Sequence, residues 1–260
     1  MSTSMRGLLE SFGLPEGLSV APLDFKWEGP DAHLAPTRVT PLSRALHNKT
    51  GAALFVLCAG SLLWAARRLE NHADVTPAVA NAEVLFCYQA DARYFSLDGP
   101  AHLKSKLPVA REVIETLCYE TSGIFFEVAG EHSPRPPITA VENVISVTRH
   151  VIGQQFLPSF RSWVSDMLGQ LARIAANPRD EFLTVHDFDG EDAYQDYVRR
   201  NVGHPFPPSV LNVGPDRPAE DYVAEFRAYL PTVDWRSNPY LAPPDVMMGL
   251  GSTRPYTYAG

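Results

Sequence analysis

The sequence predicts an all-α fold: a helical bundle of about five long helices with a Pro-rich, mostly irregular C-terminal region containing short helices. The first observation behind this prediction is the spacing of apolar residues, which recur at three- and four-residue steps. Through residues 139–176 this spacing continues for about ten helical turns, without the alternation of a strand. The second observation is a set of threonine and proline residues placed where helices begin.

Residues 1–36 are rich in glycine, proline and small side chains, and we expect an extended N-terminal arm there. One short helix is expected near residues 5–12. The aromatic residues Phe25 and Trp27 are expected to hold the arm against the body of the protein.

The next helix starts are marked by threonine followed by proline. Thr40-Pro41 predicts a helix that extends to about residue 71, either continuous or broken near Gly51. Thr76-Pro77 predicts a second helix that reaches about residue 95 and stops at Asp98-Gly99-Pro100.

Residues 51–66 contain no charged side chain, a property shared by membrane segments and buried core helices. A membrane-spanning helix needs roughly 20 apolar residues, and shorter runs are more typical of helices buried in a core. We therefore predict a core helix and no membrane span. A membrane segment is the alternative.

The central part of the chain is predicted to form further long helices. Pro108 opens one of them, and Thr139 with Glu142 has the spacing of a capping box that starts the next. Pro158 suits the first turn of a helix and does not easily continue the preceding one. The sequence thus predicts either two consecutive helices or one kinked helix in residues 139–176.

The character of the chain changes after residue 177, because the remainder holds 11 of the 23 prolines. Short helices are expected at residues 191–200 and 218–229, and an ordered coil that wraps over the bundle at residues 238–260. The predicted organisation is an arm, a helical bundle core and a C-terminal region within a single domain. These parts correspond to residues 1–36, 37–177 and 178–260.

Composition limits the classes of function. The formal net charge of −8 disfavours binding to nucleic acid and suits a basic protein partner. Cys58, Cys87 and Cys118 lie far apart without the spacing of metal ligands, which predicts reduced core residues in a cytoplasmic protein and no zinc. No nucleophile motif or phosphate-binding loop occurs, so no catalytic residue and no cofactor are predicted. His150 is interpreted as a histidine satisfied at the boundary of the core.

The densest polar cluster is residues 186–192, where Asp187, Asp189, Glu191 and Asp192 surround Gly190. Three interpretations are open. The cluster is a solvated loop whose carboxylates stabilise the N-terminus of the following helix, a surface that binds a cationic partner, or a metal site with oxygen ligands. No Lys or Arg occurs in residues 180–196, which favours the partner-binding interpretation over metal.

Several stretches resemble helical immunity proteins that are encoded beside toxins of type VI secretion or of the polymorphic class in Gram-negative bacteria. The stretches are residues 52–69, 83–94, 147–171, 204–208, 238–241 and 251–256. The resemblance implies a helical protein that neutralises a cognate toxin by tight binding, and it carries over no catalytic residue.

The leading functional hypothesis is therefore an immunity protein with partner-binding residues Asp187, Asp189, Glu191 and Asp192. The first alternative is a metal-dependent hydrolase that uses His186, Asp187 and Asp189. The second alternative is a secretion-system adaptor or effector chaperone.

Overall fold

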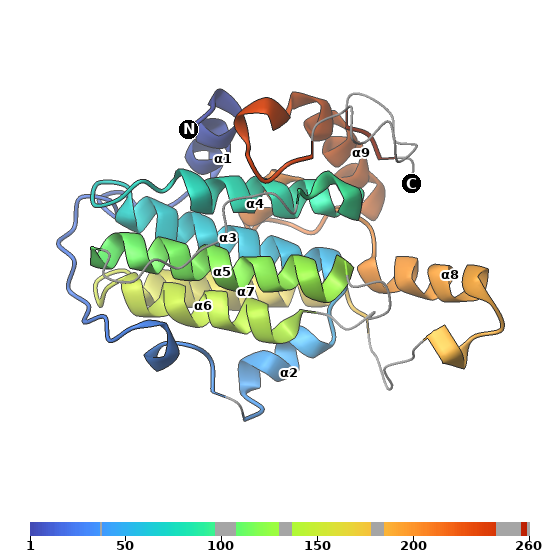
Figure 1. Cartoon of the computed structure of the whole chain (residues 1–260), viewed down its shortest axis with the longest axis horizontal. Coiled ribbons are helices and arrows are strands. Elements are labelled where there is room, and N and C mark those ends of the chain that lie inside the picture. The colour runs from blue at the N-terminus through green and yellow to red at the C-terminus, as the bar shows by residue number, and fades with distance from the viewer. Residues whose placement is uncertain (37, 97–107, 130–136, 178–184, 243–255, 259–260) are drawn as a thin grey trace.

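Helices make up the regular structure of the protein (Figure 1). The computed structural model describes residues 1–260 except 37, 97–107, 130–136, 178–184, 243–255 and 259–260. Within the described ranges there is no β-strand, and two isolated bridges join Lys49 to Ala176 and Phe95 to Leu241. The prediction of an all-α protein is confirmed.

The described α-helices are α1 (Thr3–Ser11), α2 (Pro41–His47), α3 (Gly51–Leu69), α4 (Thr76–Tyr88), α5 (Val109–Ala129), α6 (Ile138–Val151), α7 (Leu157–Ile174), α8 (Glu191–Val202) and α9 (Ala219–Tyr229). Short 3-10 helices occur at Pro30–Ala32, Ala92–Tyr94, Val185–Asp187, Pro208–Leu211, Leu230–Thr232 and Trp235–Ser237.

Helix α3 lies at the centre of the helical body, in contact with α4, α5, α6 and α7. Every residue of α3 except Arg67 is buried. A helix that is apolar on all sides is stable in water only when other elements cover it. By length and composition α3 is also able to cross a membrane, but 94% of its most apolar stretch is buried inside the protein. That burial agrees with the prediction of a core helix.

Helix α3 packs tightly against the Trp163 side chain of α7 at Gly60. A Cβ atom on Gly60 would lie 2.4 Å from the Cζ2 atom of Trp163. The indole of Trp163 is held in place because its N–H donates to the carbonyl oxygen of Leu211 at 3.1 Å. Trp64 packs beside it with ring centroids 6.3 Å apart, and both tryptophans are buried in the core.

The N-terminal segment, residues 1–36, is attached to the helical body at several points. Helix α1 buries Met5, Leu8 and Leu9 and contacts α4. Phe25 and Trp27 are partly buried against the core, as the sequence predicts. Residues 5–12 of the predicted short helix correspond closely to α1.

Arg68, near the C-terminal end of α3, is the polar centre of this attachment. Its side chain is 1% exposed and donates hydrogen bonds to backbone carbonyl oxygens of the arm and of α6. The acceptors are the carbonyl oxygens of Ala21 at 2.5 Å, Leu18 at 3.4 Å, Pro22, and Val151 at 3.3 Å. The carboxylate of Asp24 lies 3.4 Å away and completes the surroundings of the cation.

The predicted start at Thr40-Pro41 is confirmed. The Thr40 hydroxyl accepts the Ser43 N–H at 2.9 Å, while the Ser43 hydroxyl accepts the Thr40 N–H at 2.8 Å. Helix α2 ends at His47, and Thr50 caps α3, which begins at Gly51. Of the two alternatives for this region, the break near Gly51 is the one observed.

The predicted capping box of Thr139 and Glu142 is wrong. Helix α6 begins at Ile138, after Pro137, and has no side-chain cap. The carboxylate of Glu142 instead accepts the hydroxyl of Thr40. Helix α2, which Thr40 caps, contacts α6 here, so a tertiary hydrogen bond takes the side chain that local spacing assigned to a cap.

The helix predicted at Thr76-Pro77 begins there, with Thr76 as its first residue, but its predicted end near residue 95 is wrong. The N–H of Thr76 donates to the Asp74 carboxylate at 2.9 Å. The helix ends at Tyr88, not near residue 95. Asp91 accepts the N–H of Arg93 at 2.9 Å, a local hydrogen bond that competes with helix continuation. The predicted stop at residues 98–100 lies outside the described residues.

Residues 139–176 form two helices, α6 and α7, joined by a turn. Gly153 adopts a φ of 82° in this turn, a conformation that favours glycine. Pro158 occupies the first turn of α7, as predicted. The Asp24 carboxylate packs against Gly153 and accepts the Gln154 N–H at 3.2 Å, so the arm also fixes this corner.

The C-terminal region contains α8 and α9 close to the predicted positions. Tyr222 and Phe226 of α9 are buried, and so are Tyr240 and Tyr256 near the end of the chain. Residues 243–255 lie outside the described residues. The predicted wrap over the bundle and the division into three parts therefore stay predictions.

Replacement of Arg68 by Ala should lower the free energy of unfolding by about 3 kcal/mol or more, because it leaves a set of buried carbonyl oxygens without donors. Urea unfolding followed by circular dichroism measures this change. Arg67→Ala is the matched control: Arg67 is partly exposed and pairs with Glu70, an interaction worth about 1 kcal/mol or less. Equal losses in the two variants would contradict this account of the arm.

Replacement of Gly60 by Ala should lower stability by about 1–3 kcal/mol, because its methyl group would collide with the ring of Trp163. Gly169→Ala on α7 should instead raise stability by up to about 1 kcal/mol, since that Cβ has room and alanine is the better helix former. Thermal unfolding compares the two variants. A Gly60→Ala protein as stable as the parent would show that α3 and α7 do not need this close approach.

Candidate functional site

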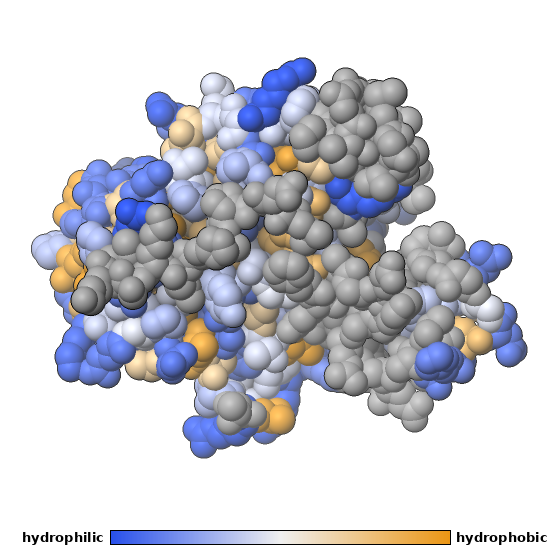
Figure 2. Space-filling view, in the orientation of Figure 1, coloured by the Kyte–Doolittle hydropathy of each residue, from blue (hydrophilic) through white to orange (hydrophobic). Residues whose placement is uncertain are grey.

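The acidic segment, residues 185–196, comprises a 3-10 turn and the first half of α8. Helix α8 projects from one end of the helical body in Figure 1. The side chains of Asp187, Asp189, Asp192 and Asp196 are exposed, and the segment contains no Lys or Arg. The surface seen in Figure 2 is strongly hydrophilic at the outer end of this projection. The segment therefore presents negative charge to solvent without a basic residue of its own.

Aromatic packing gives the acidic segment a defined shape. The ring of Phe188 lies 5.7 Å from that of Tyr194 and 4.9 Å from that of Tyr197, measured between centroids. Tyr194 is 2% exposed. Gly190 has a φ of 111° and allows the sharp turn that starts α8. At the base of the helix, the side-chain amide of Asn177 donates to Asn201 at 2.8 Å.

The predicted site residues thus share one protruding segment. Asp187 ends the 3-10 turn, and Asp189 precedes Gly190. Glu191 and Asp192 begin α8, where the helix dipole stabilises carboxylates. The side chain of Glu191 lies outside the described residues. Among the described side chains, no group of three or more His, Cys, Asp or Glu residues could hold a metal ion. His186 is exposed.

Cys58 and Cys87 are buried, and Cys118 is partly buried against the core. Burial raises the pKa of the Cys58 and Cys87 thiols well above the usual range, and it raises the pKa of Cys118 to about 12. A nucleophilic cysteine needs an accessible thiolate. These thiols are protonated at neutral pH and act as small core residues.

His150 lies at the boundary of the core, and its hydrogen-bonding capacity is used as predicted. Its Nε2 atom is 2.7 Å from the carbonyl oxygen of Lys26, and its ring stacks on His33 with centroids 3.7 Å apart. Trp27 stacks on His33 with centroids 4.6 Å apart, and its ring lies 6.2 Å from that of His150. Desolvation and the neighbouring His150 lower the pKa of His33. The stack joins the arm to α6.

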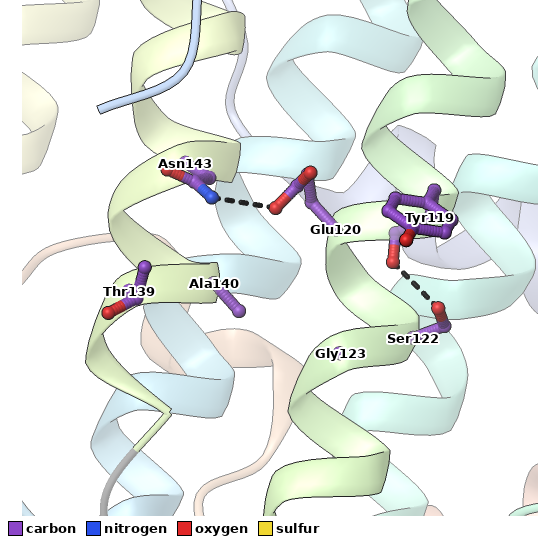
Figure 3. Close-up of a pocket in the computed structure, with 7 residues that line it drawn as sticks. All are labelled: Tyr119, Glu120, Ser122, Gly123, Thr139, Ala140 and Asn143. Carbon is purple, nitrogen blue, oxygen red and sulfur yellow. Dashed lines mark hydrogen bonds between the residues drawn. The ribbon is translucent and has the colours of Figure 1, made fainter. Parts of the chain in front are cut away.

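Sequence reasoning missed a pocket between α5 and α6 (Figure 3). Its volume is about 230 Å³, and it is lined by Tyr119, Glu120, Ser122, Gly123, Thr139, Ala140 and Asn143. Gly123 and Ala140 permit the close approach of the two helices, since a Cβ on Gly123 would lie 3.8 Å from that of Ala140. No signal in a single sequence pairs these two helix faces.

Two linked hydrogen bonds hold the carboxylate of Glu120 in the pocket. The side-chain amide of Asn143 donates to Glu120 Oε2 at 2.7 Å, and its Oδ1 accepts the N–H of Ala35 at 3.0 Å. The Ser122 hydroxyl donates to the carbonyl oxygen of Tyr119 at 2.6 Å. Figure 3 shows Glu120 between Asn143 and Tyr119. The pocket thus contains a positioned carboxylate beside an aromatic ring.

Sequence reasoning also missed the carboxyl group of Glu83, which is fully buried on α4. The side-chain amide of Asn238 donates to Glu83 Oε2 at 2.9 Å and to the carbonyl oxygen of Ala80 at 3.0 Å. Desolvation raises the pKa of Glu83, although hydrogen bonds from Asn238 and Ser4 oppose part of this effect. This contact links the C-terminal region to α4.

Comparison of the chain with protein-family models, curated proteins and solved structures finds no match.

The free energy of unfolding should fall as pH rises above the pKa of an unfolded glutamate, because folded Glu83 keeps a proton that the unfolded chain has released. The slope from this group is at most about 1.4 kcal/mol per pH unit, up to the raised pKa in the folded protein. Glu83→Gln should remove this slope and increase stability at neutral pH. Urea midpoints between pH 5 and pH 8 measure both effects.

The control for this experiment is Glu10→Gln, which also replaces a carboxyl group by an amide, but at an exposed position on α1. It should keep the pH profile of the parent. Parallel profiles for Glu83→Gln and the parent would mean that Glu83 is ionised in the folded protein throughout this range.

Proposed function

We propose that this protein is an immunity protein that binds and neutralises a basic toxin, of the type VI secretion or polymorphic class, in the cytoplasm. The observation that carries the proposal is the acidic segment, a projecting surface with exposed Asp187, Asp189 and Asp192 and no Lys or Arg. Together with Glu191, these carboxylates form the proposed contact with the toxin.

Electrostatics supports this choice of partner. The chain carries a formal net charge of −8, and the acidic segment concentrates part of that charge at one protruding place. Complementary charge accelerates encounter between proteins and disfavours partners of the wrong potential. A toxin that binds nucleic acid has a positive surface, and the row of carboxylates imitates the phosphates that such a surface recognises.

The proposed scaffold for this surface is a rigid bundle of five long helices, α3 to α7, with the C-terminal region packed on it. An inhibitor that acts by binding needs a surface whose shape is set before contact, because ordering a loop on binding reduces affinity. The packing of Phe188 on Tyr194 and Tyr197 supports such preorganisation.

The proposal is tested by producing the proteins encoded next to this chain's gene, each alone and together with the chain. We expect one of them to arrest growth when produced alone and to be tolerated when this chain is present. A stable complex should then be recovered by size-exclusion chromatography. If none is toxic, or if the chain relieves no toxicity, the proposed function is wrong.

Reversal of charge at Asp187, Asp189 and Asp192 to lysine should weaken binding to that toxin by an order of magnitude or more, as measured by calorimetry. The matched control reverses Glu10, Glu16 and Asp31, three exposed carboxylates of the arm, and therefore changes the net charge equally. Rescue of growth should fail only in the first variant. Equal affinities in the two variants would exclude the acidic segment as the contact surface.

A further inference from the structure

We propose that the pocket between α5 and α6 binds a guanidinium group, and that its occupant is an arginine side chain of a protein partner. The identity of that partner rests on the proposed function. The chemistry of the pocket rests only on its own lining residues.

The polar side chains that line the pocket offer acceptors to a ligand. Glu120 contributes a carboxylate, and Ser122 and Thr139 contribute hydroxyl oxygens. The proton of the Ser122 hydroxyl is used on the carbonyl oxygen of Tyr119, so its oxygen atom is left as an acceptor. No Lys, Arg or His is among the lining residues. The complement of such a set is a group that is positively charged and only donates hydrogen bonds.

The carboxylate is positioned before a ligand arrives. Asn143 is 8% exposed and is held by the N–H of Ala35, while its amide nitrogen donates to Glu120 Oε2. Among the described residues no cation pairs with Glu120, although its side chain is partly buried. A partly buried carboxylate without a cation gains from a charge-assisted hydrogen bond to an incoming one.

The size and the aromatic wall of the pocket favour a side chain over a cofactor. Its volume of about 230 Å³ is below the roughly 300–1,000 Å³ of typical small-molecule sites. Tyr119 is 58% exposed and lies next to Glu120, so its ring is open to a planar cation. A guanidinium group stacks on aromatic rings and donates along several directions, whereas an ammonium group is a compact point charge.

Titration of the full ¹⁵N-labelled chain with N-acetyl-arginine-N-methylamide tests the site by NMR. We expect saturable shifts of the Ser122, Gly123 and Ala140 amides. The citrulline analogue, which has the same shape without the charge, should bind at least tenfold more weakly. Absence of saturable shifts at these amides, or equal binding of the two analogues, would overturn the proposal.

Glu120→Gln should weaken arginine binding at least tenfold, whereas the control Glu10→Gln should leave it unchanged. Unperturbed amide signals elsewhere in the spectrum report that the variant is folded. If Glu120→Gln does not fold, Tyr119→Ala replaces it, because the exposed ring is dispensable for the core. Arginine binding that is unaltered in the variant used would overturn the assignment.

The source of the cation is decided by a second pair of probes. The capped peptide acetyl-Gly-Arg-Gly-amide presents arginine as a protein does, and N-propylguanidinium is a free monocation with the same head group. Binding of the peptide at least as tight as that of N-propylguanidinium supports a protein side chain, and preference for N-propylguanidinium overturns it. These titrations need no toxin, so failure of the growth rescue and failure of the pocket are separate results.

Discussion

The burial of α3 is the constraint on which the rest of the structure depends. This helix is apolar around its whole circumference, so α4, α5, α6 and α7 must cover it on every side. Gly60 then sets how closely α7 approaches, because the ring of Trp163 occupies the space of a side chain. The amphipathic helices consequently pack their apolar faces against α3, and their polar faces lie at the surface.

The arm is held by polar side chains that the helices direct toward it. Arg68 of α3 donates to backbone carbonyl oxygens of the arm, and Asn143 of α6 accepts the N–H of Ala35. Just beyond the arm, Glu142 of α6 accepts the hydroxyl of Thr40. An irregular segment has few backbone hydrogen bonds of its own, so buried side chains supply them. The same contact at Asn143 positions Glu120, which connects the attachment of the arm to the shape of the pocket.

Two kinds of negative surface result from this arrangement. The acidic segment places exposed aspartates on a projecting helix, where their effect on a partner acts through water and is reduced by salt. Glu120 is a single carboxylate in a recess, held by a buried amide, where contact with a cation is short-ranged and directional. The first arrangement suits the approach of a basic protein, and the second suits its fixation in one orientation.

The sequence alone determined that the protein is helical, that the uncharged run at residues 51–66 is a core helix, and that Thr40 caps α2. These properties depend on the spacing of apolar residues, the length of the apolar run and a local cap, and each of these is formed by residues close together in the sequence. Only the tertiary structure decided that Glu142 binds Thr40 and does not cap its own helix, that Glu83 is buried beneath Asn238, and that Glu120 lines a pocket. Each of these depends on residues 20 or more positions apart that meet through helix packing, and no local pattern in one chain records which faces meet.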